Sequence, residues 1–209
     1  MFGMTTNRNS KPAGGRQTVR TYPLAARIYS IGAPGTAWRV LRGTVRLDRI
    51  GADGTPMFAS LAMRGDVIGA ETLLFGIYTF EAVALSECEL ASWPEGSERA
   101  SRESLLQVLA VAEQRAADVM ALRCGQAAER VMRLIRLLSS PQQDDAGAPR
   151  VILPSRRDIA DITALTPETV CRTIARLQRT GTLIPKPLPG ARKDRGFCLT
   201  TEPLAPHWG

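Results

Sequence analysis

The chain has 209 residues, of which 44% are hydrophobic, and its formal net charge is +7. This length allows one large domain or two small ones with a buried core, and no run approaches the roughly 20 apolar residues of a membrane span. The first 17 residues lack the apolar segment of a signal peptide, so we expect a cytoplasmic protein without a membrane partner.

The N-terminal part of the chain has the pattern of short strands. Residues 1–20 are polar, contain glycine and show no periodicity, which predicts a disordered basic tail. From 21 to 97, β-rich runs such as WRVLRGTVRLDRI (38–50) alternate with turns at 51–55 and 64–66. Short strands at this regular spacing predict an antiparallel barrel or sandwich.

A long helix is expected next, over residues 98–124. This region lacks proline and is rich in alanine, leucine, arginine and glutamate, which are good helix formers. Such a helix can be buried in the core of its own chain or can pair with a second copy. We favour a homodimer, because the β-domain is too small to cover so long a helix. The expected seam repeats in steps of four and three and consists of Leu105, Leu109, Ala112, Ala116 and Val119.

Two helices in close succession are predicted within residues 125–200. Ser155 and Asp158 form the capping box of the first helix. Thr166 can cap the second, and Pro167 suits its first position because proline lacks the N–H that is unpaired there. The apolar side chains of the second helix are spaced to form one buried stripe, made of Val170, Ile174 and Leu177.

The flanking segments complete this domain. SSPQQDDAGAP (139–149) is expected to be a loop, and Gly181 is expected to end the second helix. LIPKPLPGARKDRGFCL (183–199) predicts two short strands joined by a basic loop, so the whole is a helix-turn-helix followed by a wing. Residues 201–209 are expected to be a tail.

The positive charge is concentrated in this C-terminal part. Between Arg150 and Cys198 there are ten Lys and Arg against four Asp and Glu, a net charge of +6, so the rest of the chain is close to neutral. A basic segment of this kind points to a polyanionic partner, although a merely solvated basic surface has the same composition.

With these parts in this order, the chain resembles the CRP/FNR family of bacterial transcription regulators from about Tyr22 to Leu199. SRRDIADITALTPETVCRTIARLQRTGTLI (155–184) is similar to the helix-turn-helix of the family, and residues 31–75 are similar to its cyclic-nucleotide-type β-roll. The resemblance implies an α+β fold with an N-terminal antiparallel β-roll, a long dimerisation helix and a C-terminal winged helix-turn-helix. It also implies a homodimer on an inverted-repeat site in double-stranded DNA, with RNA polymerase as a further partner if the protein activates transcription.

In this family the second helix of the motif enters the major groove and reads base edges. Glu168 and Arg172 are four residues apart and share a helix face. Glutamate can accept a hydrogen bond from cytosine N4, and arginine can bind guanine O6 and N7, so we favour base reading over a surface salt bridge. Thr169 and Cys171 are also placed in the base-reading set. Contacts to the DNA backbone are expected from Ser155, Arg156, Thr166, Arg176, Arg192, Lys193 and Arg195.

Cys171 occupies a position where many relatives have serine or glycine. A thiol beside Arg172 and near a helix N-terminus is open to oxidation, which would make DNA binding redox-responsive. The alternative, which the residue type favours, is a small filler of serine size against a thymine methyl group or the backbone.

The resemblance is weakest at the effector pocket. Members that bind cyclic AMP carry a glutamate after a GD-x-x-G turn, which Glu71 matches loosely, and an Arg-Ser pair soon after it. This chain has GIYTFEAVAL (76–85) there, without a basic residue, so a cyclic phosphate would find no guanidinium partner. We therefore expect no cyclic AMP binding, while an uncharged or weakly polar effector in the β-roll stays an alternative.

No cofactor, metal or catalytic site is expected. The single histidine, His207, lies in the tail, which disfavours haem binding and histidine-based catalysis. Asp66 and Glu71 belong to a turn common in the β-roll, so we do not take them for a catalytic pair. We expect a DNA-binding protein rather than an enzyme; a cyclic-nucleotide sensor and a protein-binding winged helix are the rivals. The cysteines form no CxxC pair of the kind that binds zinc and are Cys88, Cys124, Cys171 and Cys198.

Overall fold

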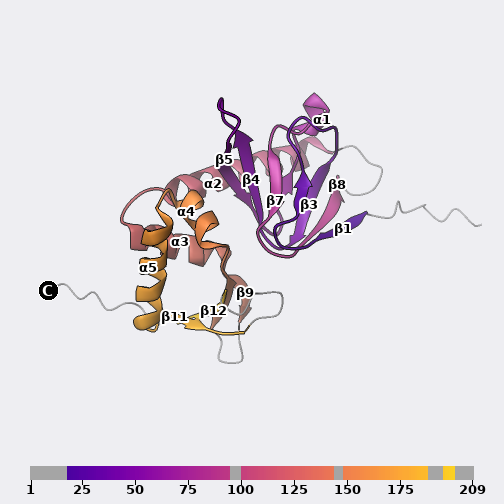
Figure 1. Ribbon diagram of the computed structural model, residues 1–209. Helices are drawn as coiled ribbons and strands as arrows, with labels where there is room; N and C mark the ends of the chain where they lie inside the picture. The colour runs from indigo at the N-terminus through magenta and orange to yellow at the C-terminus, as the bar shows by residue number, and fades with distance from the viewer. Residues whose placement is uncertain (1–17, 95–99, 144–147, 188–194, 201–209) are drawn as a thin grey trace, which may run out of the picture.

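The computed structural model describes residues 18–94, 100–143, 148–187 and 195–200. A β-domain, a long helix and a smaller domain of helices and strands follow one another along the chain (Figure 1). This order confirms the α+β fold that the sequence predicts.

Short strands and one turn of helix make up the β-domain. They are β1 (Val19–Tyr22), β2 (Arg27–Tyr29), β3 (Ala37–Arg42), β4 (Val45–Ile50), β5 (Pro56–Ala62), β6 (Val67–Ile68), α1 (Thr72–Phe75), β7 (Glu81–Ala84) and β8 (Cys88–Trp93). The strands pair antiparallel in two sheets, β1-β8-β3-β6 and β2-β7-β4-β5. Both sheets contribute to one buried cluster, for example through Val40 and Val45, because alternate side chains of a strand point to the same face. The predicted antiparallel β-roll is therefore confirmed.

The first strand begins earlier than the predicted boundary of the β-roll at residue 21. Val19 pairs with Ala91 of β8, and Arg20 pairs with Leu90, so the end of the segment predicted as a disordered tail (1–20) belongs to the sheet. β1 is largely exposed and lacks the alternation that marks a half-buried strand. Residues 1–17 lie outside the described residues.

The long helix α2 (Arg102–Ala121) follows the β-domain, and α3 (Ala127–Leu138) follows α2. Gly125 lies between them with φ +87°, a conformation that glycine adopts at little cost, so the chain can turn sharply between the two helices. Val119 is the buried residue of α2, which is described over its whole length. Most of this 20-residue helix is therefore exposed on a single copy of the chain.

The C-terminal domain contains α3, two further helices, α4 (Arg156–Thr163) and α5 (Pro167–Arg179), and the strands β9 (Ser140–Gln143), β10 (Pro149–Ile152), β11 (Leu183–Pro185) and β12 (Gly196–Leu199). The strands form one sheet of order β11-β12-β10-β9, and α3 and α5 contact it. Helices α4 and α5 begin where the sequence predicts, because the hydroxyl of Ser155 accepts a hydrogen bond from the N–H of Asp158, and that of Thr166 accepts one from Thr169. Strands β11 and β12 pair antiparallel, as expected for a wing.

The segment 139–149, which we expect to be a loop, contains strand β9 and the start of β10. Arg150 of β10 pairs with Ser140 of β9. β9 is the last strand of its sheet, and an edge strand tolerates a proline such as Pro141 because one side of its backbone needs no partner. The polar, proline-containing sequence therefore gave no strand signal.

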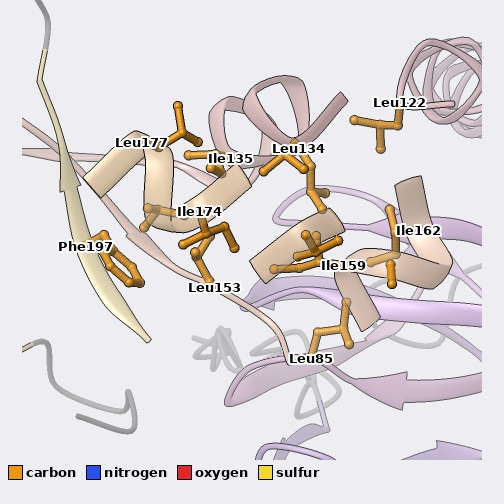
Figure 2. Packing of buried hydrophobic residues seen from close by; sticks show 14 of the residues in the cluster. Leu85, Leu122, Leu134, Ile135, Leu153, Ile159, Ile162, Ile174, Leu177 and Phe197 are labelled. Carbon is orange, nitrogen blue, oxygen red and sulfur yellow. The ribbon is translucent and has the colours of Figure 1, made fainter. Parts of the chain in front are cut away.

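One hydrophobic cluster extends across both domains. Phe58, Leu61 and Leu85 of the β-domain belong to the same buried cluster as Ile159 and Ile162 of α4. Figure 2 shows Leu85 close to the α4 side chains, with the side chains of α3 and α5 beyond them. The helix-turn-helix is thus packed against the β-domain of its own chain.

Candidate nucleic-acid interface

Helix α5 has one buried face and one exposed face. Val170, Ile174 and Leu177 are 0%, 1% and 5% exposed, which confirms the predicted apolar stripe. The stripe packs against α3 and α4, so the opposite face of α5 is left for solvent or a partner. Glu168 and Arg172 are both exposed on that side.

At the first turn of α5, hydrogen bonds and a nearby charge favour the ionised form of the exposed Glu168 carboxyl. The pKa of the Glu168 carboxyl is lowered, first by a hydrogen bond from its own backbone N–H, then by the Thr166 side chain, and also by the charge of Arg172. No ion pair joins Glu168 to Arg172 among the residues that the structure describes. Both side chains therefore keep polar atoms available to a partner.

The other two predicted base-reading residues differ in exposure. Cys171 is exposed next to Arg172. Thr169 is half-buried, and its hydroxyl lies 3.1 Å from the hydroxyl of Thr166. The structure thus brings Cys171 to the same face as Arg172, while Thr169 takes part in the cap of α5.

The predicted DNA-backbone residues lie in three places. Ser155 and Arg156 are at the start of α4, where the Ser155 hydroxyl is bonded to Asp158. Thr166, the N-terminal cap of α5, and Arg176, within α5, are both exposed. Arg195 is half-buried beside β12, whereas the other two wing residues, at 192 and 193, lie outside the described residues.

The predicted dimer seam is exposed except at one position. Leu105 and Leu109 are 42% and 56% exposed, and Ala112 and Ala116 are exposed too. Val119 is only 7% exposed and belongs to the hydrophobic cluster of its own chain. The structure therefore places Val119 away from the free face of α2.

A cavity of about 510 Å³ lies between the β-domain and α2. Most of its lining side chains are apolar. Arg115 of α2 crosses it to Asp66, with Nε 3.1 Å from Oδ2. Glu71 accepts a hydrogen bond from the N–H of Thr79 at 3.2 Å. Tyr29, stacked on Tyr78, also lines the cavity.

The hydroxyl of Tyr29 is the unusual polar group of this cavity. It is buried and has no hydrogen-bond partner among the described residues, and burial is the main cause that raises the pKa of this phenol, with the charge of Glu71 adding to it. Residues 76–85 bring no basic group, and the guanidinium groups of the lining belong to Arg115 and Arg123. Tyr29 and Arg115 carry no signal in the sequence, because nothing local links them.

Within the described ranges, none of the helices combines the length and the apolar character needed to cross a membrane. Across the same residues, His, Cys, Asp and Glu side chains do not gather in threes as metal ligands would.

Two family models match the chain. A model of the Crp-like helix-turn-helix domain matches residues 129–186, and a model of the cyclic nucleotide-binding domain matches residues 19–104. The two matches fall on the C-terminal domain and on the β-domain, respectively.

Characterised relatives cover most of the chain. The nitrogen fixation regulation protein FixK of Rhizobium meliloti (strain 1021) is 30% identical over 169 residues, which cover 80% of this chain and 78% of that protein. The protein of the same name from Bradyrhizobium diazoefficiens is 35% identical over 160 residues, covering 70% of this chain and 65% of its own length.

Solved structures share the same arrangement. A transcriptional regulator of the CRP family from Thermus thermophilus superposes with a TM-score of 0.67 at 26% identity, covering 87% of this chain and 92% of the other. FixK2 from Bradyrhizobium japonicum superposes with a TM-score of 0.61 at 28% identity, covering 88% and 92%.

Proposed function

The chain belongs to the CRP/FNR family of transcription regulators, and we propose that it acts as a homodimer on an inverted-repeat promoter site without cyclic AMP. The observation that carries this proposal is α5, whose apolar stripe is buried while Glu168 and Arg172 are exposed together. This helix reads base edges in the major groove, and RNA polymerase is the partner if binding activates transcription. The site of action is the cytoplasm, where bacterial promoters lie.

The division of roles within the interface follows from chemistry. Phosphate contacts supply most of the affinity and base contacts supply the sequence preference. Arg172 binds a guanine and Glu168 a neighbouring cytosine, with Cys171 beside them. Thr169 supports this set through the cap. Backbone contacts come from Ser155, Arg156, Thr166, Arg176, Arg192, Lys193 and Arg195.

The exposed face of α2 supports the homodimer. An apolar stripe that continues over several helical turns on the surface of one copy is typical of a helix that pairs with another. Because Val119 is buried in its own chain, Met120, which is 66% exposed, takes its place at the end of the seam. The proposed seam is Leu105, Leu109, Ala112, Ala116 and Met120.

Selection of binding sites from a random DNA library with the full chain tests this function. Two recognition helices related by a twofold axis should select an inverted repeat whose half-sites are about one helical turn apart. Footprinting of the same protein on genomic DNA should then show protection at promoters. An unrepeated site bound by a monomer would contradict the proposal.

We also propose that oxidation of Cys171 weakens DNA binding. Its thiol is exposed on the face of α5 that enters the groove. Peroxide converts a thiolate to a sulfenic acid and onward to negatively charged sulfinic and sulfonic acids, and a negative charge at this place is repelled by the phosphates. Peroxide should therefore reduce the shifted fraction in a gel-shift assay. Dithiothreitol should restore binding only where oxidation stopped at the sulfenic acid or a disulfide.

The control is Cys171→Ser, which keeps the size of the side chain. It should bind the selected site about as well as the reduced parent and resist peroxide. An equal loss of binding in both proteins would move the sensitivity elsewhere, first to Cys124, which is also exposed.

Cyclic AMP should neither bind the protein nor change its DNA affinity. Arg115 is paired with Asp66 and Asp118, and Arg123 donates to backbone carbonyls. Asp66 and Glu71 add negative charge to the same cavity, which repels a phosphate. Calorimetric titration should give no binding heat, and micromolar binding would refute this part of the proposal.

A second candidate function is a regulator gated by a different small molecule in this cavity. The hydroxyl of Tyr29, which is buried and without a hydrogen-bond partner among the residues that the structure describes, favours it, because a buried polar group without a partner is costly. The fitting ligand is uncharged or weakly polar and accepts one hydrogen bond. Native mass spectrometry of the purified protein should then reveal bound mass that Tyr29→Phe reduces.

A further inference from the structure

Arg46 of β4 connects the β-domain to the helix-turn-helix. Arg46 is only 8% exposed, although arginine side chains are mostly exposed in proteins. Its Nε donates to both carboxylate oxygens of Asp48 on the same strand, at 2.8 and 2.9 Å. Its Nη1 donates to Asp158 and to Asp161 of α4, each at 3.1 Å. One guanidinium thus holds two acids that lie more than 100 residues further along the chain.

Arg123, just beyond the end of α2, also contacts α4 and Phe58. It donates to the backbone carbonyls of Asp161 and Ile162, at 3.2 and 3.3 Å, and to that of Phe58 at 3.4 Å. The Phe58 ring lies close to both arginines, with its centroid 5.7 Å from the Arg46 guanidinium carbon and 5.2 Å from that of Arg123. We call the whole cluster the junction, which consists of Arg46, Asp48, Phe58, Arg123, Asp158 and Asp161.

The junction contacts α4, and the position of α5 depends on the position of α4. Asp158 also forms the capping box with Ser155 at the start of α4. Asp161 lies near the end of α4, and Ala164 with φ +52° makes the tight turn into α5. Since α4 and α5 pack on each other, a rotation of α4 on the β-domain carries α5 with it.

Stability alone does not explain such a cluster. Buried ion pairs cost about as much in desolvation as they return, and apolar residues of the same volume often stabilise a protein more. Directional hydrogen bonds from one planar guanidinium to two acids of one helix do fix the orientation of that helix. A dimer that binds two half-sites benefits from such an orientation, because fewer arrangements are lost on binding.

We propose that Arg46 is a positioning residue for DNA binding, which fixes α4 and α5 on the β-domain so that the two recognition helices of a dimer match the spacing of the half-sites. This inference rests on the proposed function. It assigns the β-domain a role in selecting the spacing of the site without any bound effector.

The test compares two DNA sites for each protein: the selected inverted repeat, and the same repeat with one base pair inserted at its centre. Spacing selectivity is measured as a ratio: the dissociation constant for the site with the insertion divided by that for the selected repeat. In Arg46→Ala and in Asp161→Ala this ratio should fall by about fivefold, because each variant removes guanidinium–carboxylate hydrogen bonds that fix the orientation of α4. Arg49→Ala, an exposed arginine of the same strand, should leave the ratio unchanged.

The two variants have opposite effects on charge, which separates positioning from electrostatics. Arg46→Ala removes a positive charge and Asp161→Ala a negative one, so a purely electrostatic effect would move their overall DNA affinities in opposite directions. Positioning predicts a lower spacing ratio in both, and a double variant scarcely worse than either single one. Unchanged ratios, or a gain in affinity for the selected site in both variants, would overturn the inference.

A measurement without DNA keeps this result distinct from failure of the proposed function. Amide hydrogen exchange of the full chain should show faster exchange in α4 for Asp161→Ala, whose side chain is 45% exposed and tolerates replacement, than for the matched variant Asp53→Ala in an exposed turn. Unchanged exchange in α4 would refute the junction even if the parent protein selects an inverted repeat. Faster exchange with a parent that selects no repeat would instead refute the proposed function.

Discussion

Arg172→Ala is expected to weaken binding to the selected site by roughly 1–3 kcal/mol, about 5- to 150-fold, and to relax base preference at one position of each half-site. Arg172 is exposed on α5, so its removal should leave the fold intact. Its guanidinium can donate two parallel hydrogen bonds to guanine, and alanine can donate none. The measurement is titration of the selected site, its single-base variants and random DNA.

Arg176→Ala is the matched control, because Arg176 lies one helical turn further along the exposed side of α5. As a phosphate contact it should weaken binding to all sequences alike and lower the slope of log affinity against log salt by about one. If both variants lost affinity equally on selected and random DNA, the assignment of Arg172 to base reading would be wrong.

Leu109→Glu is expected to convert the dimer to a monomer and to reduce affinity for the inverted repeat by about a thousandfold, close to the level of non-specific binding. Leu109 is 56% exposed in the single chain, so the change should lower the stability of the folded monomer little. In the dimer, two carboxylates would be buried in an apolar seam without partners, which is strongly unfavourable. Sedimentation velocity and titration of the site measure the two effects.

Gln107→Glu adds the same charge to the same helix, on a face turned away from Leu109, and is exposed too. It should leave both the dimer and its DNA affinity nearly unchanged. A Leu109→Glu protein that sediments as a dimer would show that α2 is not the dimer interface.

The helix-turn-helix could be predicted closely from the sequence because its signals are local. Ser155 and Thr166 cap their helices through neighbours three residues away, and the stripe from Val170 to Leu177 follows the helical period. Such features depend on residues within one or two turns. The exposed face of α5 follows from them, because whatever is off the stripe must face outward.

The faces of α2 could not be assigned in the same way. The helix carries apolar residues on two adjacent faces: Val111 and Val119 line the cavity against the β-domain, while Leu105 and Leu109 lie outside its lining and are 42% and 56% exposed. A sequence period shows that apolar residues recur, but it does not show which of two neighbouring stripes meets the chain's own sheet. This is why Val119 was assigned to the dimer seam.

The junction could not be predicted for a different reason. In the strand VRLDRI, Arg46 has the appearance of an ordinary charged residue, and its partners on α4 are 112 and 115 residues away. No periodicity links residues at that distance. The burial of the Tyr29 hydroxyl likewise arises only when α2 closes the cavity over the sheet.

The hydrophobic cluster that spans both domains limits how far the protein can be divided. The turn at Gly125 marks the boundary between α2 and the C-terminal domain. Even so, Phe58, Leu61 and Leu85 of the β-domain belong to the same core as Ile159 and Ile162 of α4. A fragment that starts at Ala127 would expose this apolar surface to water, at about 25 cal/mol for each Å². The DNA-binding half is therefore not a portable module, and a chimera that joins it to another sensor must also supply the apolar underside on which α4 rests.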